Sequence, residues 1–142
     1  MAIKKHGSAR WEGGLKAGRG TISTESGALD EHPYGFAQRF EGVKGSNPEE
    51  LIGAAHAACF SMAFSKILGE AGFTAEYIKT AAEVTLDKVG DGFAVTGSHL
   101  TMQAKIPEIN EGQFQEAADK AKEGCPVSKL LDAEITLQAV LQ

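Results

Sequence analysis

The sequence predicts an α+β fold with mostly antiparallel sheets around a central buried helix. Short segments of strand-like composition lie at both ends of the chain, and an uncharged run of apolar and small residues at 51–65 lies between them. Strands grouped apart from helices in this way are typical of α+β folds. Because the chain has 142 residues, we expect a single domain covering residues 1–142.

Composition and charge argue against several classes of protein. Hydrophobic residues make up 42% and charged residues 23% of the chain, which is normal for a globular protein. The net charge of −5 without a basic run disfavours nucleic acid and anionic membrane partners. No run reaches the roughly 18 apolar residues of a spanning helix, and no apolar segment follows the first lysines as in a secretory signal. We therefore expect a cytoplasmic protein with no membrane partner.

The first third of the chain predicts β structure. Residues 3–11, 18–24 and 34–41 are short strand-like segments, and glycine and proline turn signals separate them. On this interpretation Arg39 lies on a strand among aromatic residues.

The strongest predicted element is a helix that begins after Asn47 and ends between Gly69 and Gly72. Asn47 suits the N-cap, and Pro48 suits the first helical position. Residues 51–65 are apolar or small on every side, which is typical of a helix buried all round. One sheet cannot cover such a helix, so we expect a homodimer in which two of these helices pack together.

The second half of the chain predicts a hairpin, two helical segments and a final strand. The hairpin covers residues 78–89 and 93–106, joined by a glycine-rich turn. A helix with a capping box covers 110–124, a short helical turn covers 125–131, and apolar residues alternate over 135–141.

Two cysteines are the main candidates for chemistry. Cys59 lies in the middle of the predicted central helix, and Cys125 lies at the predicted N-cap of the short turn. Without an export signal both are expected to be reduced. Each is either a small buried hydrophobe or a reactive thiolate. The nearest helical cation, Lys66, is roughly 10 Å from Cys59 along the axis, so any activating charge must come from elsewhere in the fold.

The other motifs give weaker indications of function. His56 precedes Cys59 by three residues on the same helix side, and a buried histidine bonded to a neighbour is favoured over a catalytic base. The other histidines and the distant cysteines form no recognisable metal set, and the glycines match no nucleotide motif. We expect no metal and no organic cofactor.

Four segments resemble the OsmC/Ohr family. Residues 47–63 (NPEELIGAAHAACFSMA) resemble its central helix, and residues 124–128 (GCPVS) resemble its second cysteine motif. Residues 11–13 (WEG) and 34–36 (YGF) match one branch of the family. The resemblance covers essentially the whole chain.

The resemblance implies an intertwined homodimer and a thiol-dependent peroxidase that reduces organic hydroperoxides to alcohols in oxidative or osmotic stress defence. Cys59 would be the peroxidatic cysteine and Cys125 the resolving one, with a lipoyl-type dithiol as reductant. Arg39 and Glu49 would activate the thiolate and orient the peroxide. Apolar residues near these positions would favour alkyl or lipid hydroperoxides: Phe36, Phe40, Ile52, Phe60 and Met62.

The spacing of Glu49 and Cys59 bears on where such a site forms. The two residues are ten positions apart, which is roughly 15 Å along a regular helix. A glutamate side chain cannot span that distance. If Glu49 serves a thiol, it therefore serves the Cys59 of a partner chain.

Two other functions stay open from the residues alone. One is a non-enzymatic stress or binding protein whose thiols only pack. The other is a thiol hydrolase or transferase that uses Cys59 with His56.

Overall fold

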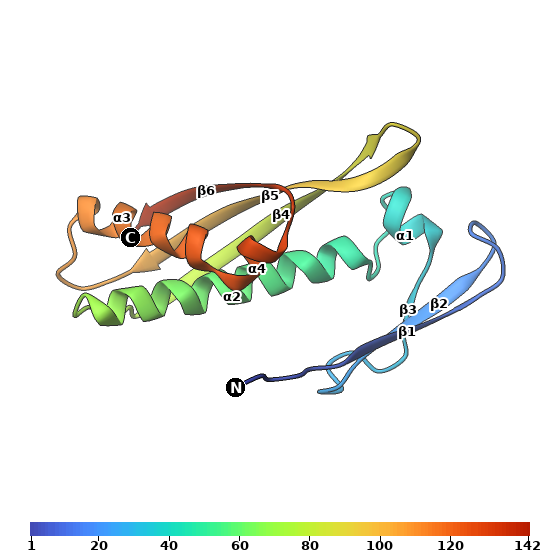
Figure 1. The fold of residues 1–142 in the computed structure, drawn as a ribbon, viewed down its shortest axis with the longest axis horizontal. Coiled ribbons are helices and arrows are strands. Elements are labelled where there is room, and N and C mark those ends of the chain that lie inside the picture. The colour runs from blue at the N-terminus through green and yellow to red at the C-terminus, as the bar shows by residue number, and fades with distance from the viewer. The chain divides into compact units, whose positions relative to one another are not determined.

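The longest element of the computed structural model, which describes residues 1–142, is the 23-residue helix α2 (Pro48–Glu70) (Figure 1). The chain forms two compact units, residues 1–51 and 52–142, and the boundary falls in the first turn of this helix. Each unit contains a three-stranded sheet of its own.

Helix α2 begins and ends at the residues that the sequence indicates. Asn47 Oδ1 accepts a hydrogen bond from the Glu50 N–H at 2.8 Å, which satisfies one of the free donors of the first turn. At the other end, Gly72 adopts the left-handed conformation with φ of +89°, and the Phe73 N–H bonds to the Leu68 carbonyl at 2.8 Å. Glycine closes helices in this way because it lacks a Cβ.

Within the single chain α2 is buried on one side only, and the burial of its other side, which the sequence analysis ties to a homodimer, stays a prediction. His56, Phe60, Phe64 and Leu68 are buried, whereas the opposite side of the helix is exposed. Met62, for example, is 77% exposed. The physical reason is that the unit of residues 52–142 offers one sheet face and one further long helix, which cover a single side of α2.

By length and composition α2 could also span a membrane, although 28% of its most apolar window is buried within the protein. A central helix of a globular protein has the same length and composition. Gly53 packs closely on the sheet, since an added Cβ would lie 3.2 Å from the Ala82 carbonyl oxygen. This contact shows that one side of α2 packs against the sheet.

The sheet of residues 52–142 has the strand order β4 (Tyr77–Val89), β5 (Gly92–Lys105) and β6 (Glu134–Leu141). The predicted hairpin is confirmed, because β4 and β5 pair antiparallel and Gly90 takes a positive φ in the turn. The final strand pairs with β5 in parallel, so the pairing is mostly but not entirely antiparallel.

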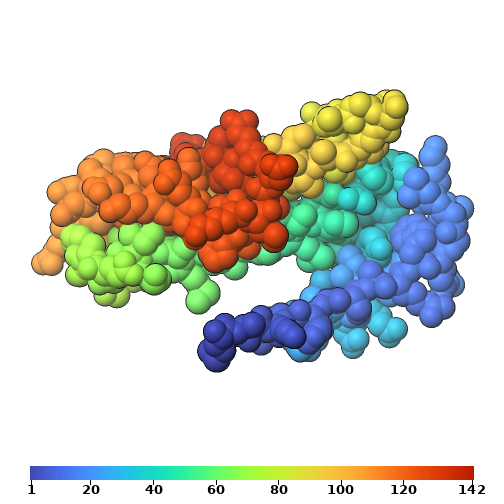
Figure 2. Space-filling view, viewed as in Figure 1, coloured from blue at the N-terminus to red at the C-terminus, as the bar shows by residue number.

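Helices α2 and α3 (Glu111–Gly124) pack on one face of this sheet, and α4 (Pro126–Leu130) follows α3 (Figure 1). In the space-filling view the orange and red surface of α3 and α4 lies beside the green surface of α2 (Figure 2). The buried apolar side chains come from α2, β5, α3 and the segments around them: Phe60, Phe64, Leu68, Leu100, Met102, Ala104, Ile106, Phe114, Ala117, Ala118, Ala121 and Cys125.

The unit of residues 1–51 contains the antiparallel sheet β1 (Gly7–Glu12), β2 (Arg19–Thr24) and β3 (His32–Tyr34), followed by helix α1 (Phe36–Phe40). Gly20 and Glu49 are its buried residues. This unit therefore has almost no core of its own.

The predicted strand at residues 34–41 is wrong beyond Tyr34, because the segment turns into α1. The rings of Phe36 and Phe40 lie 4.9 Å apart, four positions apart in sequence, which is the spacing of neighbours on a helix face. Arg39 consequently lies on a short helix rather than on a strand.

The N-terminal cap of α3 gives a direct test of the fold. Asn110 and Gln113 form the predicted capping box, with the Gln113 N–H bonding to Asn110 Oδ1 at 2.8 Å. We expect Asn110→Ala to lower the free energy of unfolding by about 1 kcal/mol, measured by urea unfolding at fixed protein concentration. Asn110→Asp keeps the acceptor and is the matched control. Equal stability of the alanine variant and the unmodified chain would contradict the role of this cap.

Candidate active site

Cys59 lies on α2, part-buried, and lines an open cavity of about 550 Å³. The cavity also contains Met62 and Lys66 from the next two turns of α2 and Pro126 from the start of α4. A molecule in this cavity would therefore reach the thiol.

Cys125 lies at the N-cap of α4, as the sequence predicts, and is fully buried. Cys59 packs against the core cluster that contains Cys125. The two thiols lie close enough for Cys125 to raise the pKa of Cys59, while the nearby Val127 N–H lowers it. The fold thus brings together two thiols that are 66 positions apart, and both are free cysteines.

The surroundings within residues 52–142 do not favour a thiolate at Cys59. Burial raises the pKa of the Cys59 thiol, the contact with Cys125 raises it further, and only the Val127 N–H lowers it. Lys66 is 78% exposed and pairs with Glu70 at 3.3 Å, so it adds little positive charge at the sulfur. No cation of the single chain lowers this pKa, which agrees with the expectation that α2 itself supplies no activating charge.

Arg39 and Glu49 form an ion pair within residues 1–51. Arg39 Nη2 and Nε donate to Glu49 Oε1 at 2.8 and 3.1 Å, and Nε also lies 3.3 Å from Oε2. The carboxylate is buried, with Glu49 8% exposed, whereas the Arg39 side chain is 38% exposed. A buried carboxylate that accepts from the guanidinium fixes its direction while leaving other N–H donors free.

Aromatic residues surround this arginine. A cavity of about 220 Å³ is lined by Trp11, Leu15, Tyr34, Phe36, Arg39 and Phe40, and the Arg39 guanidinium carbon lies 5.3 Å from the centre of the Phe40 ring. The sequence analysis did not propose Trp11 and Tyr34 as site residues. The only signal for them was that residues 11–13 and 34–36 resemble one branch of the OsmC/Ohr family.

The five apolar residues suggested from the sequence have different positions. Phe36 and Phe40 line the Arg39 cavity, and Met62 lines the Cys59 cavity. Phe60 has no exposed surface and packs in the core, so it lines neither cavity. Ile52 does not line either cavity.

His56 is the buried, bonded histidine that the sequence favours. Its Nδ1 lies 2.7 Å from Ser98 Oγ and its Nε2 lies 2.8 Å from Ser128 Oγ. Burial lowers its pKa, so the ring stays neutral near pH 7. Because both ring nitrogens are occupied, His56 is poorly arranged to act as a base toward Cys59.

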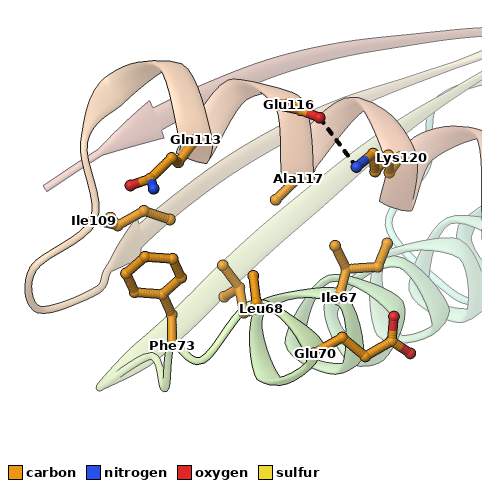
Figure 3. Close-up of a pocket in the computed structure, with 10 residues that line it drawn as sticks. Ile67, Leu68, Glu70, Phe73, Ile109, Gln113, Glu116, Ala117 and Lys120 are labelled. Atoms are coloured by element: carbon orange, nitrogen blue, oxygen red, sulfur yellow. Dashed lines mark ion pairs between the residues drawn. The ribbon is translucent and has the colours of Figure 1, made fainter.

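A further cavity of about 330 Å³ lies between the C-terminal end of α2 and the start of α3 (Figure 3). Leu68, Phe73 and Ile109 form its apolar part, and the ion pair of Glu116 and Lys120, 3.1 Å long, crosses its edge. It contains no cysteine, so it lacks the nucleophile of the first cavity.

The sequence profile described as OsmC-like protein matches residues 41–140, which include both cysteines. The chain belongs to the OsmC family. It is 59% identical over 142 residues to the protein named Peroxiredoxin OsmC of Escherichia coli K12, and the match covers all of this chain and 99% of that relative.

More distant OsmC-family proteins share the fold. The Organic hydroperoxide resistance protein OhrB of Bacillus subtilis is 27% identical over 124 residues, covering 87% of this chain and 89% of the relative. Its crystal structure superimposes with a TM-score of 0.70 over 99% of this chain and 98% of that one. An OsmC-like protein of unknown function from Vibrio cholerae, 16% identical, superimposes with a TM-score of 0.76 over 98% of this chain and 100% of that one. The predicted α+β fold is confirmed.

The proximity of the two thiols predicts the direction in which a substitution of Cys125 shifts the pKa of Cys59. Since Cys125 raises the pKa of Cys59, Cys125→Ala should lower that pKa and speed alkylation of Cys59 by iodoacetamide at a fixed mildly alkaline pH. The measurement is the alkylation rate against pH, with Cys59 identified by peptide mapping.

Val127→Pro supplies the matched opposite change. It removes the N–H donor to the Cys59 sulfur, so it should raise the pKa of Cys59. A shift in the same direction for both variants would show that general loosening, rather than these two contacts, controls the thiol.

Proposed function

We propose that this chain is a thiol-dependent peroxidase that reduces organic hydroperoxides to alcohols. The observation that carries the proposal is the proximity of Cys59 and Cys125: Cys59 packs against the core cluster that contains Cys125, and Cys125 raises the pKa of the Cys59 thiol. It occurs in a chain that is 59% identical to a protein named a peroxiredoxin and similar to proteins named for organic hydroperoxide resistance.

The reaction uses the two thiols in turn. The Cys59 thiolate attacks one oxygen of the hydroperoxide, the O–O bond breaks, and the leaving alkoxide takes a proton to become the alcohol. Cys59 is then a sulfenic acid. The Cys125 thiol displaces its oxygen as water and forms a disulfide. A dithiol of lipoyl type restores both thiols by exchange. No metal and no organic cofactor takes part, and the reaction takes place in the cytoplasm.

Arg39 supplies the positive charge that the thiol unit lacks. Its guanidinium stays charged when part-buried and offers several donors, while Glu49 sets its direction. The aromatic cavity around Arg39 binds the alkyl part of the substrate, which favours organic hydroperoxides over hydrogen peroxide.

The active unit is a homodimer in which Arg39 and Glu49 of one chain serve the Cys59 of the other. Helix α2 is unbroken from Pro48 to Glu70, so Glu49 and Cys59 of one chain are separated by roughly 15 Å of helix. Residues 1–51 bury almost nothing by themselves, and one side of α2 exposes Ala54, Ala55, Ala58 and Met62. A second chain would cover both surfaces.

The first test of this proposal counts thiols. One equivalent of cumene hydroperoxide added to the reduced chain should remove both thiols and lower the intact mass by about 2 Da. Cys59→Ser should abolish the reaction, and Cys125→Ser should still allow one oxidation of Cys59.

Each alternative function predicts a different result. Two thiols that survive for minutes would support structural cysteines instead. A thiol-dependent hydrolysis lost in His56→Ala but kept in Cys125→Ser would support a hydrolase.

The shared site is tested by mixing two inactive variants. Cys59→Ser lacks the nucleophile and Arg39→Ala lacks the cation, so each alone should be inactive. Refolded together in equal amounts, half of the dimers are mixed, and each mixed dimer regains one of its two sites. We expect roughly a quarter of the unmodified peroxidase activity per chain.

Light scattering should give a mass of twice 15.0 kDa for the unmodified chain and for the mixture. A mixture that forms dimers yet remains inactive would show that the arginine serves the thiol of its own chain.

A further inference from the structure

His56 makes two hydrogen bonds that join three elements of the unit of residues 52–142. Nδ1 bonds to Ser98 on β5 at 2.7 Å, and Nε2 bonds to Ser128 on α4 at 2.8 Å. His56 has no exposed surface and Ser98 is 1% exposed. The peroxidase mechanism assigns no role to any of these three polar groups, although the ring lies one turn of α2 from Cys59.

The other attachments of helix α4 are the packing of Val127 against the core and the bond from the Cys125 N–H to the Ala121 carbonyl at 2.9 Å. This helix is five residues long, and its N-cap residue Cys125 makes no side-chain capping bond. Its own backbone bonds, such as the Lys129 N–H to the Cys125 carbonyl at 3.1 Å, hold the turn together but do not fix its place. The Ser128 hydroxyl ties this turn to α2.

The same two elements meet again at the thiols. Cys59 of α2 packs against the cluster that contains Cys125, the N-cap residue of α4, and lines one cavity with Pro126, while Ser128 of α4 contacts His56 of α2. Because His56 and Cys59 are three positions apart, they lie on the same side of the helix. A movement of α4 away from α2 would therefore lengthen both contacts.

We propose that His56 is a positioning residue, whose hydrogen bond to Ser128 holds α4 where Cys125 can reach the oxidised sulfur of Cys59. The inference rests on the proposed peroxidase function. A neutral imidazole and a hydroxyl suit this task, because each can donate or accept and neither brings a charge into the buried contact.

The consequence concerns the fate of the sulfenic acid. In the productive step, Cys59–SOH and Cys125–SH give the disulfide and water. If Cys125 is displaced, a second hydroperoxide molecule competes with it for the sulfenic acid. Cys59–SOH and ROOH then give the sulfinic acid Cys59–SO₂H and the alcohol ROH. The Ser128 hydroxyl thus decides how the sulfenic acid divides between a reversible and an irreversible product.

The experiment compares Ser128→Ala with Ser98→Ala in the full chain. Each removes one hydrogen bond of His56, but only the first releases α4. The reduced protein is treated with about a tenfold excess of cumene hydroperoxide without reductant, and intact mass separates the disulfide, about 2 Da lighter, from the sulfinic acid, about 32 Da heavier.

We expect the fraction of sulfinic acid to rise roughly three- to tenfold in Ser128→Ala, the effect of one lost hydrogen bond. It should stay within about twofold of the unmodified chain in Ser98→Ala. Ser128→Thr, which keeps the hydroxyl, should restore the unmodified fraction. An unchanged fraction in Ser128→Ala, or equal shifts in both alanine variants, overturns the inference.

A second pair of variants decides the matter if Ser128→Ala does not fold. The amide of His56→Gln reaches the position of Nε2 and keeps the bond to Ser128, whereas the shorter amide of His56→Asn reaches the position of Nδ1 and keeps only the bond to Ser98. Sulfinic acid should increase in the asparagine variant alone, and equal fractions overturn the inference. Loss of no thiol in the unmodified chain would instead overturn the proposed function itself.

Discussion

The contact of Cys59 with the N-terminal turn of α4 is the interaction on which the thiol chemistry of this chain depends. It requires a helix whose first residues follow a buried cysteine, and the run Gly124-Cys125-Pro126 provides it. Gly124 ends α3, and Pro126 needs no N–H partner at the first position of α4. The next N–H, of Val127, is then free to donate to the sulfur of Cys59. Local rules of helix capping therefore position both the second thiol and the donor.

The electrostatics of this contact are incomplete within residues 52–142. Burial and the neighbouring Cys125 raise the pKa of Cys59, and one N–H donor does not reverse their combined effect. In the proposed mechanism the missing positive charge comes from Arg39, which lies within residues 1–51 and pairs with the buried carboxylate of Glu49. Such a carboxylate would be costly to bury alone, and its partner is a cation that keeps unused donors.

Much of this arrangement could be predicted from the sequence, because it follows from local signals. The caps at Asn47 and Asn110 and the start of α4 after Cys125 are set by a few neighbouring residues. The strand predicted after Tyr34 was wrong, because a short run with aromatic residues fits a strand as well as one helical turn. The partners of His56 could not be predicted, since Ser98 and Ser128 are 42 and 72 positions away.

The one-sided burial of α2 in the single chain supports the proposal that the chain forms a dimer. A helix of alanines and large apolar residues predicts cover on every side, but a single chain has only enough structure to cover one. Three deficits of the single chain then coincide: an uncovered side of α2, an N-terminal sheet without a core, and a thiol without a cation. Each deficit taken alone is compatible with a monomer. The proposed second copy of the chain would answer all three at once, because the N-terminal unit that needs cover carries Arg39 on α1 and the helix that needs cover carries the Cys59 thiol.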